Sequence, residues 1–371
     1  MDLSLTDEQD MLRDGVRRFV AENYEFEKRR SLAASDLGYS LDHWRTFAEL
    51  GWLALGLPED AGGLGGTLVD TALVMEAFGA ALVLEPYASN VVLSGRILER
   101  ADNQELRSRT LTALAQGRER VALAHFERES RYSLSQVDTA AARQGSDYVI
   151  RGCKSQVLDG AGADRLIVSA RLGDALALFL IDRHAAGIEM ESYRLLDDTR
   201  AAEVMLRDVK VGASSLLMSG PNVAAVLEEA IDRLILAKLA ESLGGVETAL
   251  EITAEYLRSR IQFGQPLIKF QAVQHRLAEM FVEVQEMRSI LYCGLAHIDA
   301  EVPERRRAVS AAKVIAGGAG RLVAGLAIQL HGGIGMTEEY RVGHYFKKMV
   351  TMDKLFGDGD YHLARLASGG C

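Results

Sequence analysis

The sequence predicts a mainly α-helical fold with a β domain in the middle. We expect an N-terminal helical domain over residues 1–120, an antiparallel, barrel-like β domain over residues 121–212, and a C-terminal four-helix bundle over residues 213–371. Three observations carry this prediction. Apolar residues recur at helical spacing in the first third of the chain, short apolar runs between turn residues follow, and long helical stretches with few breakers complete it.

The N-terminal domain opens with a predicted capping box, in which Thr6 and Gln9 satisfy free amides of the first helical turn. One face of this helix carries the apolar residues Met11, Leu12, Val16, Phe19 and Val20. A second helix is predicted to begin near Ser40, to stop at Gly51 and to bury Trp44, Phe47 and Leu50. The glycine-rich run 62–66 is predicted as a loop before a helix over 68–82. A phosphate loop is disfavoured there, because the Lys-Ser/Thr ending and a preceding strand are both missing.

Four short apolar runs predict strands at 121–124, 148–150, 166–168 and 176–181. Turn residues separate these runs, which is typical of antiparallel strands and not of alternating strands and helices. The β region is predicted to end near residues 209–211. Helical spacing then returns after Pro221 and predicts helices at 222–260, 270–297 and 305–330, the first of them broken only at Gly244-Gly245.

Composition and charge limit the partners of the chain. Its 371 residues, of which 48% are hydrophobic and 25% charged, are typical of a globular protein with a large core. The formal charge of −10 disfavours nucleic acid or an anionic membrane surface as the main partner. The three cysteines, Cys153, Cys293 and Cys371, are far apart, which favours neither a disulfide framework nor a zinc site.

Targeting and membrane signals are not predicted. The opening segment, Met1 to Glu8, has no basic region followed by an apolar core, so we expect no secretory signal. No uninterrupted apolar run approaches the roughly 20 residues that span a bilayer. We therefore expect a cytoplasmic protein with no membrane span and no metal.

The segment from Arg260 to Pro266 is the first that indicates a ligand. Gly264 and Pro266 end one helix and the next begins at once, so a guanidinium, the ring of Phe263 and free helix-start amides lie close together. This grouping suits a dinucleotide, whose pyrophosphate binds cations and amides while its adenine lies near a ring. The alternative is a plain helix turn with Phe263 buried and Arg260 solvated, and the residues alone do not separate the two.

The second segment runs from Gln329 to Thr337. Its glycines, Gly332, Gly333 and Gly335, would let a ligand approach the backbone closely, and Gln329 can donate and accept hydrogen bonds. Glycine-rich helix ends are common, so a simple C-cap is the better interpretation of this segment alone. His331 has no partner at metal-ligand spacing and is predicted to be a hydrogen-bonding turn residue.

Together, the two segments resemble the acyl-CoA dehydrogenase family, which has an Arg-x-x-Phe-Gly and a Gln-x-x-Gly-Gly segment in its C-terminal bundle. Residues 5–9, residues 51–59 and Gly152-x-Lys154 extend the resemblance along the chain. The resemblance implies FAD as cofactor and the oxidation of an acyl-CoA thioester between its α and β carbons, to the trans-2-enoyl-CoA. It also implies electron-transfer flavoprotein as the electron acceptor.

The resemblance also implies roles for individual residues. In homotetrameric members the two motifs reach the FAD of a neighbouring subunit and grip its ADP half. The cofactor-binding residues expected here are Arg260, Phe263, Gly264, Gln271, Gln329, Gly332 and Gly333.

The flavin-ring region departs from the family pattern. Most members have a glycine-rich and proline-containing loop that wraps the flavin, whereas residues 125–133 contain neither Gly nor Pro. A close backbone approach to the ring is harder without them. Members also tend to carry Trp and a hydroxyl residue after Gly-x-Lys, where this chain has Gln156 and Leu158.

The catalytic base also departs from the pattern. The usual Glu near the C-terminus is replaced by Phe356, which cannot abstract a proton. Some members place their Glu on a bundle helix before an Arg, and here Asp232 precedes Arg233. Apolar neighbours, with Glu228 one turn back, would raise the pKa of Asp232 as a base requires. The alternative is a surface ion network of Asp232 and Glu229 with Arg233.

Residues 355–365 resemble a branch of paired-subunit dehydrogenases in bacterial catabolism, which includes the small subunit of pimeloyl-CoA dehydrogenase and steroid side-chain enzymes. In that branch two different chains share flavin sites. We therefore expect one subunit of a heteromer. Two alternatives stay open: a catalytically silent structural subunit that completes a partner's FAD site, and a self-sufficient homomer, such as a tetramer, that acts as a dehydrogenase or oxidase.

Overall fold

The computed structural model describes residues 4–368, so Cys371 and the first three residues of the opening segment lie outside it. The chain divides into two compact units. Unit 1 comprises Met1–Ser31, Leu68–Val83 and Ile235–Cys371, and unit 2 comprises Leu32–Thr67 and Leu84–Leu234. The element order is helices, then a sheet, then helices, which confirms the predicted fold class.

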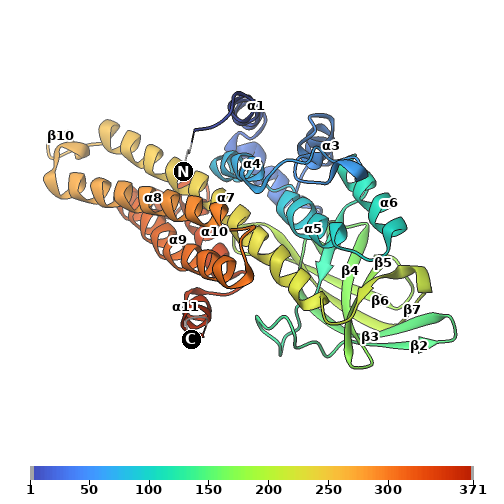
Figure 1. Cartoon of the computed structure of the whole chain (residues 1–371). Helices are drawn as coiled ribbons and strands as arrows, with labels where there is room; N and C mark the ends of the chain where they lie inside the picture. Colours follow the sequence, from blue (N-terminus) through green and yellow to red (C-terminus); the bar gives the residue numbers. More distant parts are fainter. Residues whose placement is uncertain (1–3, 369–371) are drawn as a thin grey trace. The chain divides into compact units, whose positions relative to one another are not determined.

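Unit 1 is helical, and its longest helices run side by side as the predicted bundle (Figure 1). Helix α2 (Phe26–Ala34) and helix α7 (Val223–Ser259) each cross from one unit to the other. The remaining helices of unit 1 are α1 (Asp7–Asn23), α4 (Leu68–Ala81), α8 (Gln271–Ala296), α9 (Val302–His331), α10 (Val342–Lys354) and α11 (Gly359–Ser368). The predicted helix at 68–82 and the three predicted after Pro221 agree with these bounds to within a few residues.

The start of α1 agrees with its predicted capping box. The Thr6 hydroxyl accepts from the Gln9 amide at 3.2 Å, and the Thr6 amide donates to the Gln9 side chain at 3.1 Å. Of the apolar residues predicted to share one face of this helix, Met11 is 68% exposed. Helix α1 buries only a narrow stripe that includes Val16 and Val20, and Met11 lies outside that stripe.

Gly244 does not break α7, contrary to the prediction, but lets it pass very close to α4. A Cβ added to Gly244 would lie 1.8 Å from the carbonyl oxygen of Glu76, and one added to Gly79 would lie 1.6 Å from that of Glu241. No side chain fits between two backbones at these distances. Glycine lowers the helix propensity at both positions, but it allows a close helix contact that any other residue would prevent.

The carboxylate of Glu241 strengthens the same crossing. It is buried and ion-paired with both Lys238 and Lys348. Burial alone would raise the pKa of Glu241, but the two ammonium groups lower it to about 2. The carboxylate thus stays charged, and it links α7 to α10.

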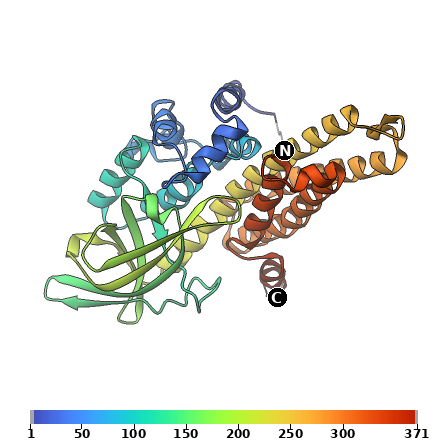
Figure 2. The same ribbon diagram turned by 180° about the vertical axis from the view of Figure 1, so that it is seen from behind.

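Unit 2 combines helices with one twisted sheet, whose strands curve around a buried core (Figure 2). Its helices are α3 (Leu41–Glu49), the π-helix η3 (Ala88–Ser94), α5 (Gly95–Glu99) and α6 (Gln104–Ala115). The strands are β1 (Val121–Ala124), β2 (Ala140–Gln144), β3 (Asp147–Leu158), β4 (Arg165–Leu172), β5 (Ala175–Asp182), β6 (Ile188–Arg194), β7 (Arg200–Val211) and β8 (Leu216–Ser219). All four predicted strands are present.

Two details of unit 2 differ from the prediction. The sheet has the order β6-β7-β3-β2-β4-β5-β8 and is mixed, because β1 and β2 pair with β4 in parallel. The β2–β3 hairpin lies between β1 and β4 in the chain and provides the long connection that a parallel pair needs. Leu50 is 52% exposed and not buried, since α3 ends at Glu49 and its C-cap turns away from the apolar face.

By length and composition alone, one stretch of the described residues could cross a membrane. It is Val302–Met336, which covers α9 and the following turn and contains an 18-residue window of high mean hydropathy. This is weak evidence, because the core helix of a soluble protein passes the same test and half of the most apolar window is buried. Helix α9 packs against α8, α10 and α11, as a central bundle helix does.

The close crossing of α4 and α7 predicts a difference between two Gly→Ala substitutions. Gly244→Ala should lower the free energy of unfolding by about 1–3 kcal/mol or more, because the helices must separate. Gly318→Ala is the matched control: Gly318 is exposed on α9 with no atom near its added Cβ, so alanine should be neutral or stabilising by up to about 1 kcal/mol. Urea unfolding measures both, and equal stability of the two variants would contradict the crossing.

Candidate functional site

The first predicted cofactor segment forms a β-hairpin between α7 and α8. Its strands are β9 (Ile261–Gln262) and β10 (Gln265–Pro266), joined by the turn Phe263-Gly264. Both turn residues have positive φ, 51° at Phe263 and 79° at Gly264. That is the conformation of a type I′ turn. The helix ends where the sequence predicts, but the hairpin was not predicted.

The side chain of Phe263 is displayed to solvent. It is 90% exposed, with an edge-to-face contact to Phe270 at 6.0 Å between ring centroids. A left-handed backbone strains any residue other than glycine, and an exposed ring gains little from burial. The alternative in which Phe263 is buried is therefore wrong. Strain and exposure together make the ring available to a ligand or to another chain.

A cation and a helix start lie beside the hairpin. The backbone of Arg260 accepts a hydrogen bond from Leu267 at 2.9 Å, which closes the hairpin, and the Arg260 side chain is exposed. Helix α8 begins at Gln271, also exposed, and no side chain of the described residues caps it. Uncapped amides at a helix start carry partial positive charge and bind phosphate groups.

The second predicted segment presents bare backbone at the end of α9. Gln329 is exposed, and so are Gly332 and Gly333, whose added Cβ atoms would meet no atom within 4 Å. Gly332 has a φ of 65°, which favours glycine at this helix end. A ligand can therefore approach the main chain here more closely than at residues with side chains.

His331 links the two segments. Its ring stacks on Tyr256 at 4.4 Å and lies 5.1 Å from Tyr340, while the Tyr256 hydroxyl donates to the His331 carbonyl at 3.3 Å. Nδ1 bonds the Ala327 carbonyl at 2.8 Å, as predicted for a hydrogen-bonding turn residue. Burial lowers the pKa of His331, which favours the neutral ring. Since Tyr256 lies one turn before Arg260, this aromatic clamp brings the ends of α7 and α9 together.

These residues fit the ADP half of a dinucleotide. A guanidinium, an exposed ring, uncapped helix amides and glycine backbone are gathered at one end of unit 1 by the His331 clamp. All of them are exposed within the described residues, so they could contact a ligand from one side only.

The stretch at 125–133 is tied inward. The fully buried ammonium of Lys154 donates to the His125 carbonyl at 3.2 Å, to Glu127 at 2.6 Å and to the Ser169 hydroxyl at 3.0 Å. The Glu127 carboxylate also accepts from the amide and hydroxyl of Thr139. Burial lowers the pKa of Lys154 to about 8, although Glu127 opposes the shift. These bonds hold the Glu127 side chain and the His125 backbone inward, whereas Arg128, Glu129 and Arg131 of the same stretch are exposed.

The other unusual flavin-ring positions lie at an irregularity of β3. The pairing of β3 with β7 shifts register between Lys154 and Val157, and Gln156 adopts a positive φ of 53°. Its side chain is exposed, and Leu158 is half-buried. Neither position supplies the aromatic cover that most family members have.

Asp232 is buried and lies on α7 within unit 2, with 1% of its surface exposed. The ion network expected around it is centred instead on Glu229, which pairs with Arg96, with Arg100 at 3.4 Å and with Arg233 at 3.5 Å. Burial alone would raise the pKa of Glu229, but Arg96 and the other cations lower it. Asp232 is thus kept from water, and Glu229 pairs with three arginines.

Phe356 follows α10 in unit 1 with a φ of 60°. Two buried side chains hold this segment by its backbone. Lys313 donates to the carbonyls of Met352 and Leu355, the latter at 2.9 Å, and His362 bonds the Phe356 carbonyl at 3.1 Å. Burial lowers the pKa of Lys313 to about 7 and that of His362 to about 4. These two side chains were not predicted to hold the segment. The available signal in the sequence was Lys313, an ionisable residue inside the apolar run of α9.

Comparison with known proteins gives a consistent family. The model for the acyl-CoA dehydrogenase N-terminal domain matches residues 6–118, and the model for the C-terminal domain of the same family matches residues 225–370. Together the two matches cover more than half of the chain.

Individual relatives agree over nearly the whole length. The acyl-CoA dehydrogenase IpdE2 of Mycobacterium tuberculosis is 29% identical over 98% of this chain and 97% of the relative. A chain of the ChsE4-ChsE5 complex from Mycobacterium tuberculosis aligns with a TM-score of 0.89 and 28% identity over 99% of this chain and 98% of that one. A variant of the Tcur3481-Tcur3483 steroid ACAD aligns with 0.87 and 28% over 98% and 97%. The chain belongs to the acyl-CoA dehydrogenase family, the FAD-linked oxidoreductases that act on CH–CH bonds.

Proposed function

We propose that this chain is one subunit of a heteromeric acyl-CoA dehydrogenase, which uses FAD to oxidise an acyl-CoA thioester to its trans-2-enoyl-CoA. One observation carries the proposal. The proposed ADP-binding residues are exposed at one end of unit 1, and Phe263, in a strained turn, is left 90% exposed by residues 4–368. A site of this kind is completed by another subunit.

In this proposal each of the exposed residues at this end of unit 1 has a defined role. Arg260 and the first amides of α8 hold the pyrophosphate, and the ring of Phe263 lies along the adenine. Gln271 and Gln329 donate hydrogen bonds, while Gly332 and Gly333 let the nucleotide lie against the backbone. Bound FAD would accept the hydride from the substrate β carbon.

Asp232 is the proposed base that removes the proton from the α carbon. Its support is burial among apolar neighbours, since a base beside a weakly acidic carbon acts best away from water. Phe356 cannot serve in this role. The carboxylate of Asp is one methylene shorter than that of Glu, so substrate or backbone placement must supply the remaining reach.

Paired assembly is supported by the relatives. One similar structure is titled as the ChsE4-ChsE5 complex and another as the Tcur3481-Tcur3483 steroid ACAD. Both titles name two chains, which agrees with the resemblance of residues 355–365 to paired-subunit enzymes such as the small subunit of pimeloyl-CoA dehydrogenase. We propose a second acyl-CoA dehydrogenase-like chain as partner and electron-transfer flavoprotein as the acceptor.

A second candidate is a catalytically silent subunit that completes a partner's FAD site. The stretch 125–133 favours it, because it lacks the Gly and Pro residues that let a backbone approach the flavin ring, and its Glu127 is paired inward with Lys154. Phe356 in place of the usual Glu favours it as well. A homomeric enzyme is the third possibility, and the assembly state separates it from the other two.

The cofactor proposal predicts the effect of Arg260→Ala. Loss of a charged hydrogen bond to pyrophosphate costs roughly 1.5–3 kcal/mol, so FAD should dissociate at least about tenfold more readily from the assembly. Arg45→Ala is the matched control, since Arg45 is an exposed arginine of unit 2 paired with Asp42. Flavin absorbance per assembly after gel filtration measures both. Full flavin retention in folded Arg260→Ala would contradict the assignment.

The one-sided site predicts an oligomer. Several large apolar side chains of unit 1 are exposed: Ile261, Phe263, Phe281, Val282, Ile334 and Met336. Obligate interfaces bury roughly 2,000 Å² or more and are apolar, as such side chains require. Light scattering at micromolar concentration should show no stable monomer once the partner chain is present. A monomer that retains FAD would rule the proposal out, and a stable homotetramer with activity would favour the homomeric alternative.

The base proposal predicts that Asp232→Asn keeps fold and flavin yet loses turnover by roughly 10²–10⁴-fold. Glu229→Gln is the matched control, because it removes the neighbouring ion network without touching the proposed base. Turnover is measured on the complete assembly with an artificial electron acceptor and several acyl-CoAs. If Asp232→Asn turns over within a few-fold of the parent, the carboxylate belongs to the partner and the silent-subunit alternative holds.

A further inference from the structure

Unit 1 contains a cavity that the cofactor and base residues do not use. Its volume is about 460 Å³, and it lies between the residues that lead into α1, helix α4 and the C-terminal part of α8. The wall is mostly aliphatic and includes Leu5, Val69, Leu73, Leu291 and Leu295. This volume lies within the range of small-molecule sites, which are apolar concavities with a few well-placed polar groups.

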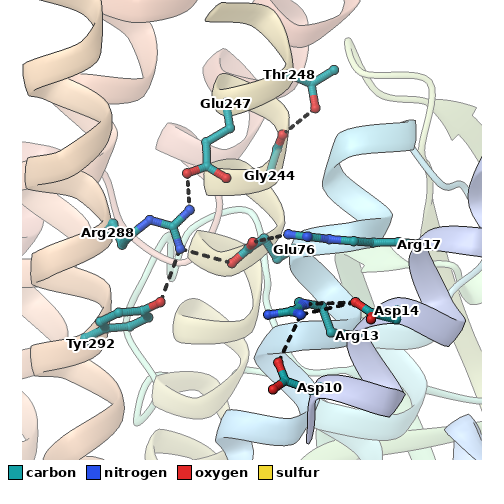
Figure 3. A network of polar contacts seen from close by, with 10 residues as sticks. All are labelled: Asp10, Arg13, Asp14, Arg17, Glu76, Gly244, Glu247, Thr248, Arg288 and Tyr292. Carbon is teal, nitrogen blue, oxygen red and sulfur yellow. Dashed lines mark hydrogen bonds and ion pairs between the residues drawn. The ribbon is translucent and has the colours of Figure 1, made fainter. Parts of the chain in front are cut away.

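The polar end of the cavity is formed by Glu76 on α4 and Tyr292 on α8. Figure 3 shows Arg288 between them. Arg288 donates to the Tyr292 hydroxyl at 3.1 Å, lies 3.7 Å from the Glu76 carboxylate and also pairs with Glu247 on α7. Arg17 on α1 pairs with the other Glu76 oxygen at 3.3 Å. The polar end is therefore fixed from four helices.

The charges at this end balance. Two guanidinium groups, of Arg17 and Arg288, face two carboxylates, of Glu76 and Glu247. An anionic ligand would meet Glu76, and a cationic ligand would have to compete with arginines already in place. Burial raises the pKa of Glu76, although Arg288 opposes the shift. A further carboxylate would raise it again. An uncharged head group avoids both penalties.

The hydrogen-bonding groups left over match a hydroxyl. The Tyr292 oxygen accepts from Arg288, and its proton has no acceptor within the part of the chain that the structure describes. The Glu76 carboxylate has two oxygens with about four acceptor directions, more than its two cationic partners occupy. A ligand hydroxyl on the cavity side of the Arg288 guanidinium would lie between them, accept from Tyr292 and donate to Glu76. A pure hydrocarbon would leave this end unsatisfied.

We propose that this cavity binds an uncharged aliphatic or alicyclic alcohol, with its hydrocarbon body against the leucines of α4 and α8 and its hydroxyl between Glu76 and Tyr292. The site is independent of the proposed dehydrogenase function. It requires neither FAD nor an acyl-CoA.

The test compares 1-octanol, octanoate and octylamine as probes of the complete assembly. Saturation-transfer NMR and titration calorimetry should detect 1-octanol, with octanoate and octylamine at least about tenfold weaker because each places a charge beside one already paired. Tyr292→Phe should weaken 1-octanol by roughly two- to tenfold, the effect of one neutral hydrogen bond.

A blocking variant separates this cavity from any other apolar site. Ala296 lines the cavity and is exposed at its rim. The larger side chain in Ala296→Trp should block the cavity and abolish the 1-octanol signal. Ala21→Trp is the matched control, an exposed alanine on α1 outside the lining, and should leave binding unchanged. Melting temperatures establish that both variants fold. Equal 1-octanol binding by parent, Ala296→Trp and Tyr292→Phe would overturn the proposal, and so would octanoate binding as tight as that of the alcohol.

Discussion

The contact of α4 with α7 at Gly79 and Gly244 is the constraint on which unit 1 depends. It sets the path of α7 across the bundle, and the Glu241 ion pairs link the same place to α10. The C-terminal end of α7 carries Tyr256, which stacks on His331. The position of the proposed cofactor residues therefore depends on a backbone contact several turns earlier in α7. The same contact places Glu76, whose carbonyl meets α7 while its carboxylate faces the cavity. The positions of the proposed cofactor residues and of the cavity therefore both depend on this one helix contact.

The two flavin-related regions of the chain have opposite character. The residues proposed to bind the ADP half of FAD are exposed, and Phe263 among them also has a strained backbone. In the stretch after β1, the Glu127 carboxylate faces inward and pairs with the buried Lys154. Backbone strain is often found at functional sites, whereas a satisfied buried pair needs no ligand. This contrast supports the proposal that the chain supplies one half of a shared site.

Local sequence patterns predicted most of the elements but few of the contacts. The helices after Pro221 and strands such as 121–124 follow from apolar spacing, which adjacent residues determine. The parallel pairing of β1 with β4, the exposure of Met11 and the role of Gly244 depend on elements distant in the chain. The proposed cofactor residues were predicted from two sequence motifs. The His331 clamp, in contrast, joins residues from three separate segments, so no single window of sequence could predict it.

The frame around Phe356 has a consequence for how such enzymes diverge. Lys313 and His362 hold this segment through main-chain carbonyls, a feature common to every amino acid. These contacts can therefore hold the segment whichever side chain stands at this position. After a gene duplication, one copy can exchange its reactive group while the scaffold stays under selection for folding and assembly. Heteromers with unequal subunits are a natural product of such drift, because neither copy needs to refold to change its part.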